Sequence, residues 1–190
     1  LNDQGELLVE ELSVYTLSRN NRTATKKLHL SYPSVLNSYS IEVSQGTGVV
    51  REISSSPGGF DARIFLEQEV TQFLMTTEYS LSGVVEIGTD IAVLSYRFWE
   101  PNSDAMTRDI SLSIELPEAI ISRITKDDIS VRPYKEARVE IEGNSVKLRM
   151  KSVLSNASGE IKISFPKNIA STMPNAVSTT VSKSSIRKEH

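Results

Sequence analysis

Two pairs of adjacent carboxylates, Glu10-Glu11 and Asp127-Asp128, are the first residues in this chain that could do acid–base chemistry. A glycoside hydrolase needs two carboxyl groups about 5 to 9 Å apart across a cleft. Neighbouring side chains on a strand point to opposite faces of a sheet, so neither dipeptide forms such a pair by itself. We therefore interpret both as solvated edge or bulge charges. A hydrolase would need two carboxylates brought together by folding.

Nucleophilic and zinc chemistry are limited by the residues present, because the chain has two histidines and no cysteine. His190 lies in a polar terminal run, so a Ser-His-Asp triad would have to use His29. That residue lies between two leucines in a strand pattern, and no Gly-x-Ser-x-Gly elbow occurs. One usable imidazole without thiols argues against a catalytic zinc site. We interpret His29 as a strand-surface residue.

Oxygen ligands for calcium occur at Asn102, Asp104 and Asp109. The Asp-x-Asp-x-Asp-Gly pattern of a calcium loop is absent around them. We therefore expect no resident metal or other cofactor, and we expect the chain not to be an enzyme.

Aromatic residues near the middle of the chain could bind a ligand without catalysis. Trp99 shares strand parity with Arg97 and lies opposite Tyr96. If the Tyr96 side is buried, Trp99 lies toward solvent or toward a junction between units, where it could stack on a sugar or anchor a partner. We name Trp99, Tyr96 and Arg97 as candidate contact residues. The interpretation we favour for Trp99 is a plug between two units.

Length and charge narrow the classes of function. A chain of 190 residues can bury roughly 70% of its unfolded surface without disulfides. Its formal net charge of −3 argues against sequence-independent nucleic-acid binding, which needs clustered Lys and Arg. No apolar run approaches the roughly 20 residues that span a bilayer, so we expect the chain itself to be soluble.

The segment 90–117 contains the clearest strands, predicted at 91–99 and 107–116. In the second of these, Ile110, Leu112, Ile114 and Leu116 share one face, and serines with Glu115 occupy the other. That apolar face requires a core. Many short strands with Gly, Pro and Asn between them predict an all-β chain of stacked antiparallel sandwiches, of immunoglobulin or fibronectin type.

The remaining strand patterns predict two units. We place an N-terminal sandwich at residues 1–103 and a smaller sandwich at residues 104–168, with about seven and five strands. Residues 45–48 and 142–145 read as hairpin turns, and residues 54–59 as a loop. One short helical turn fits within 118–124. The apolar face of segment 7–17 switches at Glu10-Glu11, which predicts a bulge, with an amphipathic helix as the alternative.

The end of the chain changes in composition. Residues 169–190 are rich in Ser and Thr and end in a basic run, so we interpret them as a flexible tether toward a membrane segment. A short strand near 176–181 is the alternative for part of this segment.

Several motifs, taken in order, resemble the prokaryotic predicted membrane proteins of the DUF2207 family, a domain of unknown function. They are Gly5 with Val9 and Glu10, the strand of Asp90, Ala92, Leu94 and Tyr96, the strand Ile110 to Pro117, and the segment Ile161 to Lys167. The resemblance covers residues 5–168. It implies an extracytoplasmic β-rich region of a membrane-anchored protein, with a cleaved signal before it and transmembrane helices after it. It implies no activity and no catalytic residues.

We therefore expect a structural or protein-interaction module at the cell surface, which contacts a protein partner or a second copy of itself. One alternative is a carbohydrate-binding or adhesion module that uses Trp99, Tyr96 or Tyr79. The other alternative is a hydrolase with a carboxylate pair assembled by folding.

Overall fold

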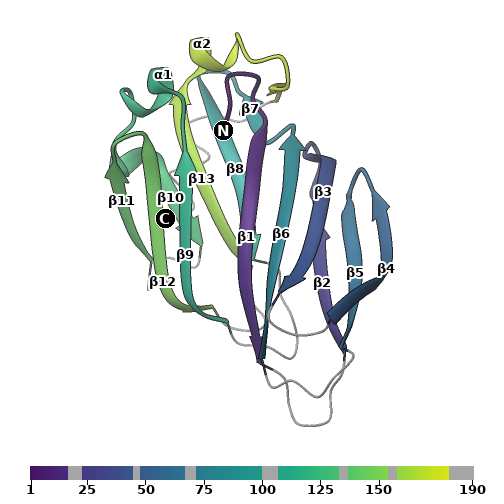
Figure 1. The fold of residues 1–190 in the computed structure, drawn as a ribbon. Helices are drawn as coiled ribbons and strands as arrows, with labels where there is room; N and C mark the ends of the chain where they lie inside the picture. The colour runs from purple at the N-terminus through teal and green to yellow at the C-terminus, as the bar shows by residue number, and fades with distance from the viewer. Residues whose placement is uncertain are drawn as a thin grey trace. The chain divides into compact units, whose positions relative to one another are not determined.

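The computed structural model describes residues 1–16, 23–44, 48–66, 72–99, 107–132, 137–153 and 158–179. Strands make up most of the described chain, which confirms the all-β prediction (Figure 1). The chain forms two compact units. Unit 1 contains Leu1–Glu6 and Gly83–His190, and unit 2 contains Leu7–Ser82. Along the chain, unit 2 is therefore an insertion into unit 1.

Unit 2 consists of six strands in two antiparallel three-stranded sheets, in the orders β1-β6-β3 and β2-β5-β4 (Figure 1). The strands are β1 (Leu7–Thr16), β2 (Thr23–His29), β3 (Val35–Ser44), β4 (Gly48–Ser56), β5 (Gly59–Leu66) and β6 (Gln72–Ser82).

Both sheets of unit 2 contribute to one core. Its buried members are Ala24, Ile64, Leu66, Phe73 and Met75, with Tyr15, Ile41 and Val43 packed against them. The rings of Tyr15 and Phe73 stack with centroids 4.9 Å apart. Burial raises the pKa of the Tyr15 phenol, so that hydroxyl stays neutral. Residues of both sheets thus contribute to one buried core.

The turns of unit 2 differ from two predictions. The expected hairpin at 45–48 would pair β3 with β4, but these strands belong to different sheets, and residues 45–47 lie outside the described part of the chain. Residues 54–59, expected as a loop, instead form a tight β4–β5 hairpin around Pro57 and Gly58. The carbonyls of this turn accept hydrogen bonds from the backbone N–H of Leu36 at 2.9 Å and of Leu30 at 2.9 Å. The composition indicated an interruption between two strands here, but it did not indicate how many residues the interruption contains.

Unit 1 holds a five-stranded sheet in the order β10-β13-β8-β7-β14 and a three-stranded sheet in the order β11-β12-β9. All described pairings are antiparallel except β14 with β7. The strands are β7 (Val85–Ile87), β8 (Ile91–Trp99), β9 (Thr107–Glu115), β10 (Ile129–Arg132), β11 (Arg138–Glu142), β12 (Ser145–Val153), β13 (Gly159–Pro166) and β14 (Val177–Ser178).

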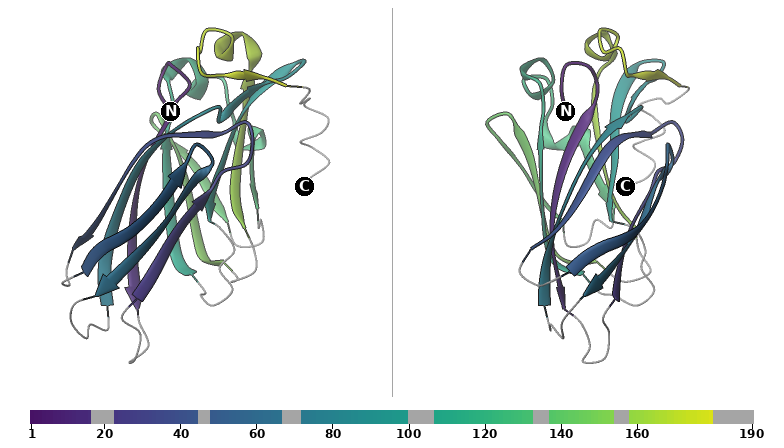
Figure 2. Two further views of the ribbon diagram at one scale, coloured as in Figure 1. Left: turned by 90° about the vertical axis from the view of Figure 1, so that its right-hand side faces the viewer. Right: turned by 45° about the vertical axis from the view of Figure 1, so that its right-hand side comes forward.

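The helices of unit 1 are single turns, α1 (Glu118–Ile121) and α2 (Lys167–Ala170), which lie at the same end of the unit (Figures 1 and 2). A 3-10 turn, Lys126–Asp128, precedes β10. None of the helices in the described part of the chain has the length and apolar composition needed to cross a membrane.

Several local predictions hold in unit 1. β8 and β9 match the two central strands to within one residue. Ile114 and Leu116 are buried, whereas Glu115 is exposed. The hairpin turn of Gly143 and Asn144 joins β11 to β12, with Glu142 paired to Ser145 and Gly143 at a φ of 57°. The predicted helical turn is α1. These features depend on near neighbours in the chain, and for that reason the sequence indicates them well.

The predicted domain boundary requires correction. We expected the units to meet at 103–104, but the compact units divide at Glu6/Leu7 and at Ser82/Gly83. One residue of unit 1, Asn175, forms hydrogen bonds to the chain beside both of these boundaries. Its backbone N–H donates to the Gln4 carbonyl at 3.0 Å, and its own carbonyl accepts from the Gly83 N–H at 3.2 Å. Strand counting along the chain cannot detect contacts between segments so far apart.

The start of the predicted tether is also wrong. Residues 169–179 belong to unit 1, where Ala170 and Met173 are buried. Val177–Ser178 form β14, which confirms the alternative of a short strand. Residues 180–190 lie outside the described part of the chain.

Candidate interaction surface

The three candidate contact residues predicted on β8 do not form one surface. Tyr96 is buried, Arg97 is exposed and Trp99 is half-buried. A register shift interrupts the alternation, because Arg97 pairs with Glu160 but Trp99 pairs with Gly159, leaving Phe98 as the extra residue. The strand parity used to place Trp99 therefore does not apply. Trp99 belongs to unit 1.

The aromatic platform expected for sugar binding is not assembled from the named residues. Tyr96 is buried in unit 1 and Tyr79 is buried in unit 2, so neither ring is available for stacking. The indole N–H of Trp99 is buried and has no hydrogen-bond partner among the described residues. Trp99 thus remains a half-buried side chain of unit 1.

The residues considered above for acid–base and metal chemistry have local roles in the described chain. Asp128 accepts hydrogen bonds from the Thr125 backbone N–H and hydroxyl, both at 3.0 Å, and so caps a 3-10 turn. His29 is exposed on β2, as predicted, with Nε2 3.2 Å from Asp61 Oδ1. No group of three or more His, Asp or Glu side chains in the described ranges is arranged to hold a metal. Asn102 and Asp104 lie outside those ranges, and the side chain of Asp109 is not described.

The first strand, β1, is regular throughout, so the predicted bulge at Glu10-Glu11 is wrong. Its ten residues pair with β6 in one unbroken register, from Leu7 with Leu81 to Thr16 with Gln72. Alternation then places Leu8, Leu12 and Val14 on the outer face of the sheet. These side chains are 66%, 65% and 67% exposed. We call these three residues the β1 stripe.

Apart from Leu74 and Val35, the described residues around the stripe on this face are polar or acidic. Leu74 of β6 lies opposite Val14, and Thr76 lies opposite Leu12. Glu10, which lies within the stripe, is directly opposite Glu78. Other outward residues of β6 and β3 include Ser38, Ser40, Glu42 and Ser80, with a hydrogen bond of 2.8 Å between the hydroxyls of Ser38 and Ser80. Among the described side chains of this face there is no Lys or Arg.

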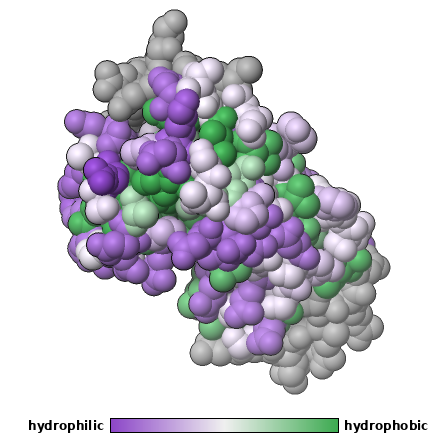
Figure 3. Space-filling view, turned by 90° about the horizontal axis from the view of Figure 1, so that it is seen from above, coloured by the Kyte–Doolittle hydropathy of each residue, from purple (hydrophilic) through white to green (hydrophobic). Residues whose placement is uncertain are grey.

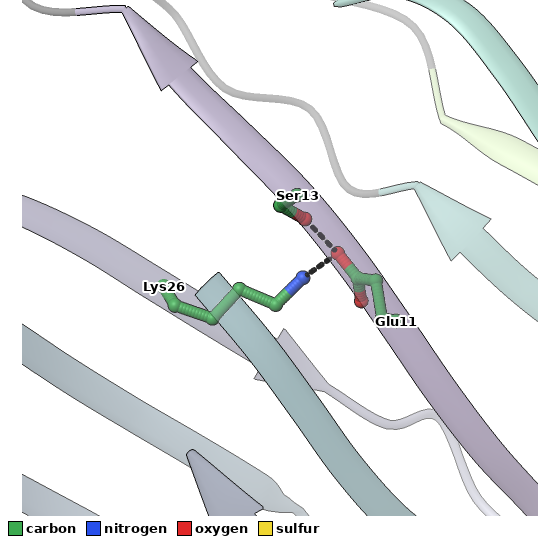
Figure 4. A network of polar contacts seen from close by, with 3 residues as sticks. All are labelled: Glu11, Ser13 and Lys26. Atoms are coloured by element: carbon green, nitrogen blue, oxygen red, sulfur yellow. Dashed lines mark hydrogen bonds and ion pairs between the residues drawn. The ribbon is translucent and has the colours of Figure 1, made fainter. Parts of the chain in front are cut away.

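The inner face of the same strand carries polar groups. Glu11 points between the sheets and forms an ion pair with Lys26 of β2, in the opposite sheet (Figure 4). The Ser13 hydroxyl donates to the same Glu11 oxygen at 3.0 Å. The side chains of Lys26 and Glu11 are only 13% and 24% exposed. A charged pair therefore links the two sheets of unit 2 from within.

Thr77 adds an uncompensated polar group to this interior. It is the β6 partner of Glu11 and is 0% exposed, and its hydroxyl has no hydrogen-bond partner among the described residues. An unpaired buried hydroxyl costs about 1–3 kcal/mol.

We expect Thr77→Val, which replaces that hydroxyl by a methyl group of similar shape, to leave the free energy of unfolding unchanged or to raise it by about 1 kcal/mol. Urea denaturation followed by far-UV circular dichroism measures the change. Thr76→Val on the outward side of the same strand is the matched control. If Thr77→Val, but not Thr76→Val, lowers the free energy of unfolding by about 2 kcal/mol or more, the Thr77 hydroxyl makes a stabilising hydrogen bond in solution.

β1 thus exposes Leu8, Leu12 and Val14 on one face, while its other face carries the half-buried Glu11 and Ser13 beside Leu7 and Tyr15. Isolated apolar side chains at the surface are ordinary, and Figure 3 shows such patches scattered among hydrophilic residues. The stripe differs because its members alternate along one face of one strand. A shift of the register by one residue would turn these side chains inward but would turn Leu7 and Tyr15 outward, so no single register buries every apolar residue of β1. Such a conflict between sequence and folding is expected at a functional surface.

No family model matches this chain, and no curated protein or solved structure matches it.

Proposed function

We propose that the chain is a non-enzymatic protein-interaction module whose contact surface is the outer face of the β1-β6-β3 sheet. The observation that carries this proposal is the β1 stripe, in which Leu8, Leu12 and Val14 are each about two-thirds exposed. Burying a leucine or valine side chain completely contributes about 1.5–3 kcal/mol. Covering the exposed parts of these three would supply several kcal/mol, enough for a small interface to form.

Charge limits the chemistry of the partner. Glu10, Glu42 and Glu78 lie on the same face as the stripe, and Glu10 directly faces Glu78 across the strands. Like charges opposite one another destabilise a sheet. A partner that covers this face gains most if it offers apolar side chains over the stripe without adding carboxylates beside these three residues.

We further propose that the module stands outside a prokaryotic membrane, in a protein held there by segments beyond this one. The resemblance of residues 5–168 to DUF2207 ectodomains supports this proposal. Protease accessibility of the protein in intact cells tests it, since an extracytoplasmic module is cleaved without lysis and a cytoplasmic one is protected.

Site-specific photo-crosslinking tests the contact surface. We replace Leu12 with p-benzoylphenylalanine and, as a matched control, Lys27, an exposed outward residue of β2. Irradiation of cells should give a protein adduct from position 12 and none from position 27. The adduct should disappear when Leu8 and Val14 are changed to Thr. Equal adducts from both positions, or adducts indifferent to Leu8 and Val14, would contradict the proposal.

The variant Leu8→Thr/Leu12→Thr/Val14→Thr is expected to fold with its free energy of unfolding within about 1 kcal/mol of the wild type, because the three side chains are already in water. Threonine also keeps the strand preference of the segment. Self-association of the purified chain, measured by sedimentation velocity, should nevertheless be lost. Leu7→Thr, on the buried face of the same strand, is the control and should cost about 2 kcal/mol or more.

A further inference from the structure

The edges of the two sheets in unit 2 are unequal. Edge strands are β1 and β3 in one sheet, and β2 and β4 in the other. β3 has a register shift at Leu36/Ser38 and β4 has one at Val50/Glu52. Bulges protect sheet edges from pairing with other chains. β1 and β2 have no such interruption.

The outer faces distinguish the two regular edges. Outward residues of β2 are threonines, Lys27 and His29, and exposed Lys is a common protection against edge pairing. Outward residues of β1 are the stripe and Glu10. Of the four edge strands described in unit 2, β1 therefore combines a regular backbone with an apolar outer face. The edge of β1 that has no partner among the described strands is suited to accept another strand.

We infer that β1 pairs antiparallel with β1 of a second copy, joining two three-stranded sheets into one continuous sheet. This inference rests on the proposed function and names the partner. A second copy supplies an edge strand of the same kind, because a two-fold arrangement sets one β1 antiparallel beside the other.

Charge selects the register of this pairing. Residues directly opposite in an antiparallel pair lie on the same face, so two registers join nine of the ten residues of β1. A register centred on Glu11 sets that carboxylate against its own copy, which is destabilising. A register centred on Leu12 sets Leu12 against Leu12, Glu10 against Val14 and Glu11 against Ser13. It brings no two carboxylates opposite one another, and Ser13 already donates to Glu11 within one chain.

The size of the contact predicts its strength. Nine residues of antiparallel strand span about 30 Å. One strand pair with three apolar side chains per copy lies at the small end of specific interfaces, so we expect a dissociation constant of about 10 µM. The native chain should therefore pass from monomer to dimer in sedimentation velocity between about 1 and 100 µM.

Single cysteines test the register, and the natural chain has none to interfere. Leu12→Cys should form a disulfide-linked dimer of about twice the 21.1 kDa chain, because opposite Cβ atoms come within reach of a disulfide. Its oxidation should be about tenfold faster or more than that of Thr25→Cys, an exposed control on β2. Glu10→Cys and Val14→Cys should each crosslink poorly alone and efficiently when mixed.

The inference is overturned if the native chain stays monomeric up to about 100 µM, ten times the expected dissociation constant. It is also overturned if Leu12→Cys forms disulfide-linked dimers no faster than Thr25→Cys. The third contrary result is a Glu10→Cys variant that crosslinks alone as fast as its mixture with Val14→Cys. The proposed function is tested separately by the photo-crosslink at position 12. An adduct whose mass is not twice that of the chain would support the contact surface but would show that its partner is another protein, not a second copy. Absence of any adduct would reject both.

Discussion

Replacement of Gly59 by alanine is expected to destabilise unit 2 by about 2–6 kcal/mol. Gly59 has a φ of 129°. Residues other than glycine rarely adopt this backbone angle, and doing so costs about 1–3 kcal/mol. A Cβ atom there would also lie 1.8 Å from the Leu28 carbonyl oxygen and 2.8 Å from its carbon. Both are backbone atoms of the paired strand β2, so relief requires a shift of the sheet, which adds about 1–3 kcal/mol.

Gly58→Ala is the matched control for this prediction. A Cβ at Gly58 would meet only Ser56 Oγ at 3.6 Å, an ordinary contact. We expect this variant to change the free energy of unfolding by less than about 1 kcal/mol. Amide hydrogen exchange in β5 and β2 reports the local loss. Equal protection in the two variants would show that the β4–β5 turn adapts and that the close approach to Leu28 is not required.

Removal of the Lys26 ammonium group is the second substitution expected to have a large effect. Lys26→Met should lower the free energy of unfolding by about 2–4 kcal/mol, because Glu11 would keep a charge between the sheets without its partner. We place the value below that of fully buried pairs because Glu11 remains partly accessible to water. Amide exchange of β6, which pairs with β1, measures the effect.

Two controls separate the ion pair from packing. Lys27→Met removes a charge from the outward side of the same strand and should change stability by about 0.5 kcal/mol or less. The double variant Glu11→Leu/Lys26→Met replaces both charges by apolar groups and should recover the wild-type stability or exceed it. A double variant as unstable as Lys26→Met would mean that the pair stabilises unit 2 beyond what apolar packing can replace.

The double variant also bears on the β1 stripe. If Glu11 becomes leucine, the inner face of β1 loses the carboxylate that disfavours a register centred on position 11. The mixed-cysteine experiment in that background should then lose its preference for Glu10→Cys with Val14→Cys. The half-buried Glu11 carboxylate would thus specify the register of pairing, a role that polar groups have at other interfaces.

Short-range features of this chain could be read from its sequence. The alternation of serine with isoleucine and leucine in 110–116 correctly predicted the buried and exposed faces of β9, because side chains on a strand have a period of two. The hairpin at Gly143-Asn144 and the turn of α1 followed from residues that adopt those conformations locally. The all-β class follows from the sum of such segments.

Which face of β1 is buried was decided only by the tertiary structure. Alternation defines two faces of a strand but not which of them meets the core, and here Lys26, from the opposite sheet, accommodates Glu11 on the inner side. The candidate surface was missed for this reason, since a bulge was the simplest way to bury every leucine and valine of the segment. The signal in the sequence was Lys26, an inward charge on a strand whose alternate residues Ala24 and Leu28 are buried.

The division into units was likewise a tertiary result. Strand patterns in 1–103 look continuous, but Leu1–Glu6 bonds to a loop near residue 175 and leaves Leu7–Ser82 as an insertion. Composition and period determined that the chain forms antiparallel sheets and where most strands lie, because those properties depend on near neighbours. The partners of each strand, the burial of Glu11 and the exposure of Leu8, Leu12 and Val14 depend on segments distant in sequence, whose contacts exist only once the sheets have packed.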